Sequence, residues 1–408
     1  MLCGLLGRTL GHSYSPQIHG LLGSYTYSLF EKEPEEVGDF LRNGDFTGIN
    51  VTMPYKKTVI PFLDELSPTA QKLGVVNTIV RRSDGTLWGH NTDYFGFLTL
   101  VSKSGIQPAG KKALVLGSGG ASCTAQRVLA ELGAQVVVIS RSGPDNYENL
   151  HRHADAAIIV NATPLGMYPG NGVSAVDLRD FPNLQGVLDA VYNPARTKLL
   201  LDAETLGIPH AGGLWMLIAQ AKEASECFTG TVIDNKRMEE IYRQVSMGLQ
   251  NIALIGMPGC GKSTVGRLLA EKTGRKILDS DQEIPLLAGK SIVDIFAQDG
   301  EEVFRQFETQ ALESLSKQSG GVLVTGGGCV TQMRNYPLLH QNSRIFWLQR
   351  DIEKLPTDGR PLSQLNQLSQ LYEARKDRYA AFADDIVDNN GSIEEAVETI
   401  LAALEGQV

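Results

Sequence analysis

The sequence lacks the features that mark several protein classes. Its five cysteines are scattered and form no CxxC pair, which argues against a disulfide framework and against a structural zinc site. Arg8 and His12 interrupt the apolar stretch at the start, so we expect neither a signal peptide nor a membrane-spanning helix. The net charge is -9 and no basic cluster stands out. Nucleic acids and anionic membranes are therefore not expected partners.

What the sequence contains is an ordinary globular composition. Of its 408 residues, 42% are hydrophobic and 20% are charged, as in folded domains generally. At about 150 residues per domain, this length predicts two or three folding units. Cysteines without a pairing pattern fit a reducing compartment, so we expect a cytoplasmic protein.

Two glycine-rich loops divide the chain, one at 117–122 and the other at 256–263. Each follows a short β-branched run and precedes a helical pattern, which is the strand, loop and helix unit that builds parallel sheets. We therefore predict an α/β chain. Residues 1–246 would hold an α/β substrate domain (about 1–100 and 214–246) and a Rossmann-type domain (about 101–213), and residues 247–408 a P-loop domain like the nucleoside-monophosphate kinases.

The second loop matches the pattern GxxxxGK[ST] with the right flanks. Backbone N–H groups at such a helix start bind phosphates and glycine permits their close approach, while Lys262 reaches the outer phosphates and the Ser263 hydroxyl binds Mg²⁺. The pattern predicts a nucleotide site. The expected contacts are Gly256, Gly259, Cys260, Gly261, Lys262, Ser263 and Thr264.

Charged residues that follow this loop are candidates for binding the molecule that accepts the phosphoryl group. Residues 276–281 read as a strand that ends in Asp279 and Asp281, which a period of two places on one side. One carboxylate would serve Mg²⁺ and the other a hydroxyl. Farther on, Arg305 and Glu308 share a helix face, so that the carboxylate would fix the guanidinium.

Glycines and further arginines complete this set. The predicted strand at 321–325 runs into Gly326, Gly327 and Gly328, where a ligand ring has access to the backbone. Arg360 and Arg375 add guanidinium groups suited to carboxylate and phosphate. Taken singly, each of these residues also has an ordinary interpretation as a surface side chain or a loop glycine.

In their order, the motifs LDSDQEI, SIVDIF, GEEVFRQFE and GGG resemble shikimate kinase over residues 251–404. The resemblance implies ATP as the nucleotide, Asp279 in the Mg²⁺ shell and Asp281 as the base for the attacking hydroxyl. Arg360 would be the lid arginine that contacts the transferring phosphate. Shikimate would be bound by Asp281, Arg305, Gly327 and Arg375.

The lid interval, residues 347–375, is shorter than the family pattern. It carries leucines at helical spacing, namely Leu362, Leu365, Leu368 and Leu371. The ordinary interpretation is an amphipathic lid helix that covers its own domain. The alternative hypothesis is that this stripe contacts the first half of the chain.

The first loop, Gly117-x-Gly119-x-x-Ser122, departs from GxGxxG at its third position, but it lies between a strand and a helix as a dinucleotide fold requires. The next strand ends in Ser140-Arg141-Ser142. An acidic residue for the ribose 2′-hydroxyl is absent there, and an arginine offers charge to a 2′-phosphate, so we predict NADP(H). A solvated arginine is the alternative. The expected contacts are Gly117, Gly119, Gly120, Ala121, Ser140 and Arg141.

Polar residues before this loop suit a small polyhydroxylated acid. They include Ser13 and Ser15, with Ser15 expected as a helix N-cap before Pro16. Asn50 and Thr52 share one side of a predicted strand. Lys56, Asn77 and Asp93 add a cation, an amide and a carboxylate from separate elements.

Together these runs resemble shikimate dehydrogenase over residues 3–244. The resemblance implies that Ser13 and Ser15 bind the substrate carboxylate, and that Lys56 and Asp93 form the catalytic pair. Ring oxygens would be bound by Asn50, Thr52, Asn77 and Gln220, and the nicotinamide side would be lined by Asn161, Thr163 and Tyr192. Whether Lys56 donates the proton or stabilises charge stays open at this stage.

The sequence thus predicts a bifunctional enzyme of the shikimate pathway. NADPH would reduce 3-dehydroshikimate to shikimate, and ATP would then phosphorylate the new hydroxyl. Two alternatives are a non-catalytic regulator that senses shikimate or quinate, and a quinate or shikimate dehydrogenase fused to another small-molecule kinase. Substrate channelling and homo-oligomer formation are left open.

Overall fold

The chain divides into two compact units, Met1–Val245 and Ser246–Val408. The computed structural model describes residues 1–11, 13–355 and 365–406, and of residues 365–367 only the backbone. Of the residues predicted above, Arg360 and Leu362 lie outside this part of the chain. Helix α8 (Asn235–Leu249) runs through the division, which lies one residue before the boundary expected from the sequence.

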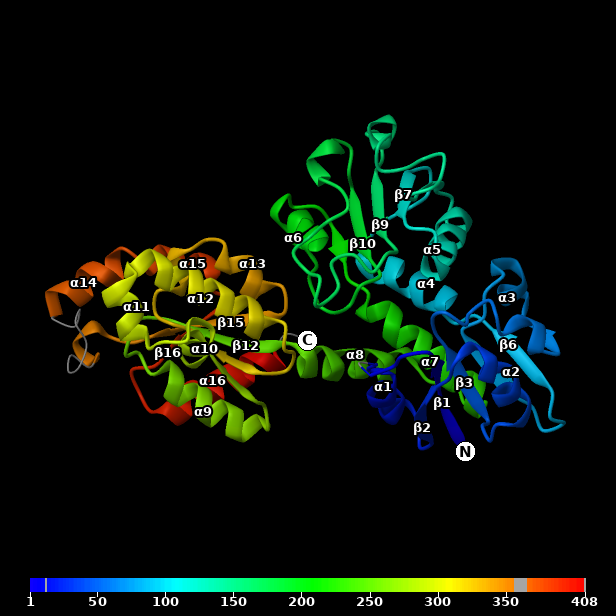
Figure 1. Ribbon diagram of the computed structural model, residues 1–408, viewed down its shortest axis with the longest axis horizontal. Helices are drawn as coiled ribbons and strands as arrows, with labels where there is room; N and C mark the ends of the chain where they lie inside the picture. Colours follow the sequence, from blue (N-terminus) through cyan, green and yellow to red (C-terminus); the bar gives the residue numbers. More distant parts are fainter. Residues whose placement is uncertain (12, 356–364, 407–408) are drawn as a thin grey trace. The chain divides into compact units, whose positions relative to one another are not determined.

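The first sheet of the first unit is mixed. Its strand order is β2-β1-β3-β5-β6-β4, with β1, β2 and β3 parallel and β5 antiparallel to both β3 and β6. Its strands are β1 (Leu2–Gly7), β2 (Thr26–Glu31), β3 (Gly48–Val51), β4 (Glu65–Leu66), β5 (Thr78–Arg81) and β6 (Leu87–His90), and its helices are α1 (Ser15–Leu22), α2 (Pro34–Asn43) and α3 (Pro68–Leu73). This part of the unit is blue to light blue in Figure 1.

The second sheet of this unit is fully parallel, in the order β11-β10-β9-β7-β8. The chain leaves β7 for β8 on one side and then returns to β9 on the other, so a topological switch point lies between β7 and β9, where such sheets bind ligands. The strands are β7 (Lys112–Leu116), β8 (Gln135–Ile139), β9 (Ile158–Asn161), β10 (Gly186–Asp189) and β11 (His210–Ala211), and the helices are α4 (Asp93–Ser104), α5 (Gly120–Glu131), α6 (Lys198–Thr205) and α7 (Leu214–Thr229).

Strand β7 shows why this sheet is buried on both faces. Ala113 and Val115 pack into one core cluster, whereas Leu114 and Leu116 pack into another. Side chains of a strand alternate between the two faces, so a continuous apolar run fills both cores.

Helices α4 and α7 pack closely against each other. A glycine makes this approach possible, because a Cβ at Gly96 would lie 2.6 Å from the backbone oxygen of Met216. The packing fixes the start of α4, where Asp93 lies, against the helix that carries Gln220.

The second unit is a five-stranded parallel sheet in the order β13-β14-β12-β15-β16. Helices α9 and α16 lie side by side on one face of it (Figure 1). The strands are β12 (Asn251–Ile255), β13 (Ile277–Asp279), β14 (Val322–Val324), β15 (Ser343–Gln349) and β16 (Asp385–Asp388). The helices are α9 (Lys262–Thr273), α10 (Ser280–Ala288), α11 (Ile292–Gln298), α12 (Gly300–Ser316), α13 (Asn335–His340), α14 (Leu365–Glu373), α15 (Lys376–Phe382) and α16 (Ile393–Glu405).

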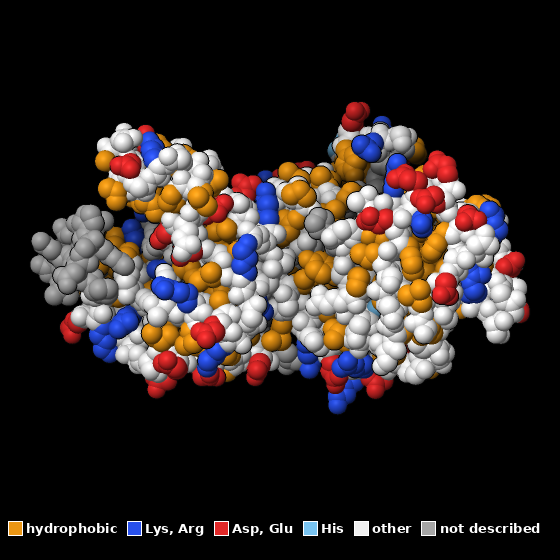
Figure 2. All heavy atoms as spheres, turned by 60° about the horizontal axis from the view of Figure 1, so that its bottom comes forward, with side chains coloured by type: hydrophobic (Ala, Val, Ile, Leu, Met, Phe, Trp, Pro, Cys, Tyr) orange, Lys and Arg blue, Asp and Glu red, His pale blue; other side chains and the backbone are white. Residues whose placement is uncertain are grey.

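These sheets confirm the α/β fold class. The leucines of the lid interval that the structure describes pack within their own unit, since Leu368 is buried in its core and Leu371 packs against that core. On the face shown in Figure 2, basic and acidic side chains are interspersed. Among the described residues, no helix is long and apolar enough to cross a bilayer.

The buried β12 strand gives a direct test of the second core. We expect Leu254→Ala to lower the free energy of unfolding of this unit by about 2–5 kcal/mol, because it leaves a cavity at a fully buried site. Hydrogen exchange of β12 and β14 in increasing urea measures this value. Leu286→Ala, at a side chain that is 78% exposed, is the matched control and should stay within about 0.5 kcal/mol of the parent. Equal effects of the two changes would contradict this packing.

Candidate active sites

One small cavity of about 240 Å³ in the first unit gathers side chains from distant parts of the sequence. Its wall includes all the predicted substrate residues and the predicted catalytic pair, namely Ser13, Ser15, Asn50, Thr52, Lys56, Asn77, Asp93 and Gln220. Gly213, Met216 and Leu217 also line it and were not predicted. The wall of this cavity is therefore mixed, with polar side chains beside apolar ones that come from Leu5 and Val51 as well as from the start of α7.

Lys56 and Asp93 form an ion pair in this cavity. Lys56 Nζ donates to Asp93 Oδ2 at 2.5 Å, and the two side chains are 21% and 10% exposed. Asp93 is the first residue of α4, where the helix dipole favours a negative charge. The carboxylate thus holds the ammonium group at the cavity wall while part of it stays accessible.

The amide side chains of the cavity are fixed by a buried hydrogen-bond network. Asn77 Oδ1 accepts from the Thr92 backbone at 2.7 Å, and Asn77 Nδ2 donates to Thr92 Oγ1 at 3.0 Å. Asn50 Nδ2 donates to Thr78 Oγ1 at 3.2 Å, and Asn50 Oδ1 accepts from Tyr27 Oη at 2.8 Å. Tyr27, Thr78 and Thr92 were not predicted as site residues. For Thr92 alone the sequence held an indication, which is its position next to Asp93.

The start of α1 differs from the expectation. Ser15 is the first helical residue rather than the N-cap, which is Tyr14, and no side chain among the described residues caps this helix. Instead the Ser15 backbone N–H donates to Ser13 Oγ at 3.2 Å. The predicted capping role of Ser15 was therefore wrong, because the chain turns one residue earlier than the serine and proline pattern indicates.

A larger cavity of about 890 Å³ lies at the switch point of the second sheet. It adjoins the small one, because Ala121, Ala190 and Tyr192 line both. The predicted residues on its wall are Gly117, Gly119, Gly120, Ala121, Ser140, Arg141, Thr163 and Tyr192. Tyr147 lies on the same wall as Arg141 and was not predicted.

The glycine loop of this cavity is shaped by close approach. Gly117 has a φ of 107°, and a Cβ there would lie 2.8 Å from the Thr163 methyl carbon. Helix α5 begins at Gly120, so its first N–H groups face the cavity end of β7 and suit a phosphate. The exposed Arg141 guanidinium adds positive charge at the end of β8.

Asn161 does not line either cavity. It is buried at the end of β9, where its Oδ1 accepts from the Thr163 backbone at 3.1 Å and from Thr163 Oγ1 at 2.6 Å. Its Nδ2 donates to Asp189 at 2.9 Å and to the Leu165 carbonyl at 3.1 Å. The structure therefore places Asn161 behind the wall that Thr163 forms.

In the second unit, the loop after β12 turns through glycines with positive φ, which are Gly256 at 146°, Gly259 at 82° and Gly261 at 100°. Lys262 Nζ donates to the carbonyls of Gly256 and Met257 at 2.9 and 3.0 Å. The lysine thus bridges the loop from its own helix, while Ser263 and Thr264 are exposed beside it.

Two buried residues, Cys260 and Asn389, stabilise the phosphate loop. Cys260 is fully buried, so its side chain belongs to the core rather than to a ligand contact. Its carbonyl accepts from Asn389 Nδ2 at 2.6 Å, which ties the loop to the end of β16. Asn389 was not predicted, because this contact spans 129 residues of sequence.

The carboxylate that ends β13 and the one that follows it are not arranged as a strand pair. The strand ends at Asp279, and Asp281 lies in the first turn of α10. Asp279 Oδ1 accepts from the Asp281 backbone N–H at 2.9 Å, so Asp279 is the N-cap of that helix. The expectation of strand alternation was wrong here because a capping aspartate ends the strand first.

Arg305 is buried between two carboxylates of its own helix. Its Nη1 donates to Glu308 and its Nη2 to Glu301, each at 2.9 Å. Burial alone would lower the pKa of Arg305, but the charges and hydrogen bonds of Glu308 and Glu301 outweigh it and raise the pKa. Burial raises the pKa of Glu308, although Arg305 opposes that shift.

The three glycines after β14 make room for these charged groups. A Cβ at Gly328 would lie 2.1 Å from Arg305 Nη1, and one at Gly326 would lie 2.7 Å from Glu308 Oε1 and 3.0 Å from Asp281 Oδ1. The absence of side chains at these glycines therefore lets the chain's own charged groups lie close to the backbone. The sequence had suggested that a ligand ring would use this space.

Gly327 lies between the phosphate loop and the last arginine. A Cβ at this position would lie 2.6 Å from Pro258 of the loop. The Gly327 carbonyl accepts from Arg375 Nη1 at 3.1 Å and from Tyr379 Oη at 2.5 Å. Arg375 and Asp281 both interact electrostatically with Glu308, so the charged groups of this site form one cluster.

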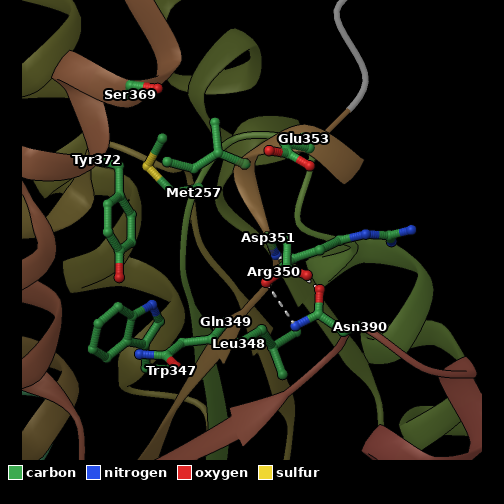
Figure 3. Close-up of a pocket in the computed structure, with 11 residues that line it drawn as sticks. Met257, Trp347, Leu348, Gln349, Arg350, Asp351, Glu353, Ser369, Tyr372 and Asn390 are labelled. Carbon is green, nitrogen blue, oxygen red and sulfur yellow. Dashed lines mark hydrogen bonds between the residues drawn. The ribbon is translucent and has the colours of Figure 1, made fainter. Parts of the chain in front are cut away.

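A pocket of about 760 Å³ opens beside the phosphate loop at the end of β15. Figure 3 shows Met257 and Tyr372 on one side of it and the pair of Asp351 and Asn390 on the other. Asn390 Nδ2 donates to Asp351 Oδ1 at 3.1 Å, and the Asp351 backbone N–H donates to Asn390 Oδ1 at 2.9 Å. This pair fixes the loop after β15 to the loop after β16.

Comparison with known proteins assigns each unit to a family. Residues 5–79 match the family described as shikimate dehydrogenase substrate binding domain, and residues 258–405 match the family described as shikimate kinase. The chain is 34% identical over 266 residues to the shikimate dehydrogenase (NADP(+)) of Clostridium perfringens strain 13, a match that covers 60% of this chain and 98% of that protein.

Solved structures give the same result for the first unit. Shikimate dehydrogenase 1 from Peptoclostridium difficile is 37% identical with a TM-score of 0.55, covering 60% of this chain and 97% of that one. Shikimate 5-dehydrogenase from Thermus thermophilus, in complex with NADP(H) and shikimate, is 32% identical with a TM-score of 0.53, covering 60% of this chain and 99% of that one.

Proposed function

The chain belongs to the shikimate dehydrogenase family over its N-terminal 60% and joins to it a shikimate kinase domain, and from this premise we propose which residues perform each activity. It is a bifunctional enzyme of the shikimate pathway that uses NADP and ATP. The first unit, Met1–Val245, would carry the reduction of 3-dehydroshikimate, and the second the phosphorylation of shikimate.

The Lys56 and Asp93 pair is the observation that carries the dehydrogenase assignment. NADPH, when bound, supplies a hydride to the ketone carbon. The ketone oxygen then gains negative charge, and the Lys56 ammonium is the proton donor at the cavity wall that can neutralise it. Asp93 holds that ammonium in place through the hydrogen bond and ion pair between them.

The other side chains of the small cavity fix the ring. We propose that the Ser13 and Ser15 hydroxyls bind the substrate carboxylate, since both lie on the cavity wall near the start of α1. The ring oxygens would be bound by Asn50, Thr52, Asn77 and Gln220. Because Asn50 and Asn77 are held by buried hydrogen bonds, they present their amides in one orientation.

The larger cavity suits NADP(H). The first N–H groups of α5 would bind the pyrophosphate, and the Arg141 guanidinium would bind the 2′-phosphate. Because Ala121, Ala190 and Tyr192 line both cavities, a nicotinamide in the larger one would reach the substrate in the smaller one.

In the kinase unit, catalysis would depend mainly on the positioning of the reactants and on the neutralisation of the phosphate charges. We propose that Lys262 moves its ammonium from the loop carbonyls to the outer phosphates of ATP, and that Asp281 accepts the proton of the attacking hydroxyl. Arg305, Gly327 and Arg375 would hold shikimate. Arg360, the expected lid arginine, lies outside the described residues.

The residues near the phosphate loop fit Mg²⁺. Ser263 offers an exposed hydroxyl and Asp279 a carboxylate at the end of β13, and oxygen atoms are the ligands that Mg²⁺ prefers. We also propose a cytoplasmic location, since the described cysteines are free thiols and a reducing compartment keeps them so.

Removing the proposed catalytic lysine of each unit tests whether the two units carry separate activities. Lys56→Ala should lower kcat of the dehydrogenase by about 10²–10⁴-fold, because the proton donor is lost, and it should leave kinase activity unchanged. Lys262→Ala should abolish phosphorylation and spare the dehydrogenase. NADPH oxidation and ADP formation, assayed separately on the full chain, measure both. Loss of both activities from either change would refute independent active sites.

Cofactor choice is tested at Arg141. Arg141→Ser should raise KM for NADPH by about tenfold or more and leave KM for NADH within twofold, because only the phosphorylated cofactor has a group for the guanidinium. The matched control is Arg127→Ser, which removes an exposed arginine of α5 that pairs with Glu131. A parallel rise of KM for both cofactors would contradict the assignment.

The buried carboxylate behind Arg305 is tested by a change that conserves shape. Glu308→Gln should raise KM for shikimate by about tenfold or more, because Arg305 loses the buried charge that orients it. Glu301→Gln removes the other partner of Arg305, whose side chain is 65% exposed, and should change KM less than threefold. Kinase initial rates at varied shikimate measure both, and equal effects would contradict the geometry.

A further inference from the structure

Asp189 is a fully buried carboxylate that neither cavity exposes. It ends β10, beside the wall shared by the two cavities of the first unit. Three neutral groups donate to it. They are the Val191 backbone N–H at 2.9 Å, Asn161 Nδ2 at 2.9 Å and Thr197 Oγ1 at 2.6 Å.

Two of these donors lead directly to the cavity wall. The Val191 amide precedes Tyr192, which lines both cavities. Asn161 holds the backbone and the hydroxyl of Thr163, which lines the larger cavity. One carboxylate oxygen, Asp189 Oδ1, accepts from both donors, so the loops after β9 and β10 are tied to the same atom.

The third donor, Thr197, connects Asp189 to the start of helix α6. Thr197 is the N-cap of α6, where its hydroxyl oxygen also accepts from the Leu200 backbone. Its side chain packs against the loop after β9, since a Cβ at Gly166 would lie 3.3 Å from Thr197 Cβ. The carboxylate therefore joins two loops of the wall and the start of a helix.

A charge at this position works against the stability of the fold. Burial raises the pKa of Asp189 to about 6, and its hydrogen bonds from Thr197, Val191 and Asn161 only partly oppose that shift. Buried carboxylates without a cation are costly, and an uncharged amide has nearly the same shape. Three converging donors are a reason to keep the carboxylate, because an asparagine has one acceptor oxygen where the aspartate has two.

We propose that Asp189 is a positioning residue of the dehydrogenase, which sets Thr163 and Tyr192 at the distance that the cofactor and the substrate ring require. The proposal rests on the dehydrogenase function proposed for this unit. It predicts that Asp189 acts on binding through the wall it holds and does not take part in proton transfer, since the Lys56 and Asp93 pair performs that step.

Asp189→Asn in the full-length enzyme tests this role. The amide nitrogen can donate to Thr197 Oγ1 but cannot accept from it, so the Thr197 O–H loses its charged acceptor and a weaker neutral bond of reversed direction replaces the 2.6 Å one, while the side-chain volume is conserved. We expect KM for NADPH to rise at least tenfold and KM for 3-dehydroshikimate at least threefold, with kcat within threefold of the parent. The thermal midpoint should be unchanged or higher, because a buried charge has been removed, and kinase activity should be unchanged.

Two controls separate positioning from stability. Val187→Ala removes a fully buried side chain of the same strand and should lower the thermal midpoint without changing either KM. Thr197→Ser keeps the hydroxyl and should behave as the parent, whereas Thr197→Val should reproduce the KM rise of Asp189→Asn, which keeps the test informative should the aspartate variant fold poorly.

The outcomes are distinguishable. Parent-like KM values in both Asp189→Asn and Thr197→Val would overturn the proposal, as would a lowered thermal midpoint with unchanged KM. A parent enzyme that fails to oxidise NADPH with 3-dehydroshikimate would instead overturn the proposed function itself.

Discussion

Parallel strands end at one edge of their sheet, and the backbone N–H and C=O groups of the segments that follow have to find partners there. Both parallel sheets of this chain are organised by that constraint. The loop after β7 begins a helix at Gly120, and the loop after β12 begins one at Lys262. The first N–H groups of a helix lack the intrahelical acceptor of later residues, which is the common basis of the two proposed phosphate sites.

A second feature of the active sites is that several of their charged side chains are largely shielded from water. The charged groups of each site are held by partners of the chain before any ligand arrives, as with Lys56 by Asp93 and Arg305 by Glu308. Such pairs cost desolvation, which their mutual attraction and hydrogen bonds offset. The benefit is preorganisation, because a group fixed in place loses little entropy when the substrate ring binds.

The sequence predicted most of what local patterns encode. The two glycine loops and the order of the domains were readable because strand, turn and helix patterns are local properties, whereas the roles of the residues that line the small cavity were given by the resemblance to shikimate dehydrogenase. Residues joined by long-range packing were not. Tyr27 reaches Asn50, and Asn389 reaches Cys260, across intervals that carry no sequence pattern. At Asp279 a helix cap overrode the strand pattern, and at Ser15 the helix began without one.

We infer that both units act on the same ring, one beside NADPH and the other beside ATP. The most direct test incubates the full chain with 3-dehydroshikimate, NADPH, ATP and Mg²⁺ and identifies the product by mass spectrometry. We expect shikimate 3-phosphate when all four are present, and shikimate when ATP is withheld. Accumulation of unphosphorylated shikimate in the complete mixture, or consumption of ATP without a phosphorylated ring, would contradict it.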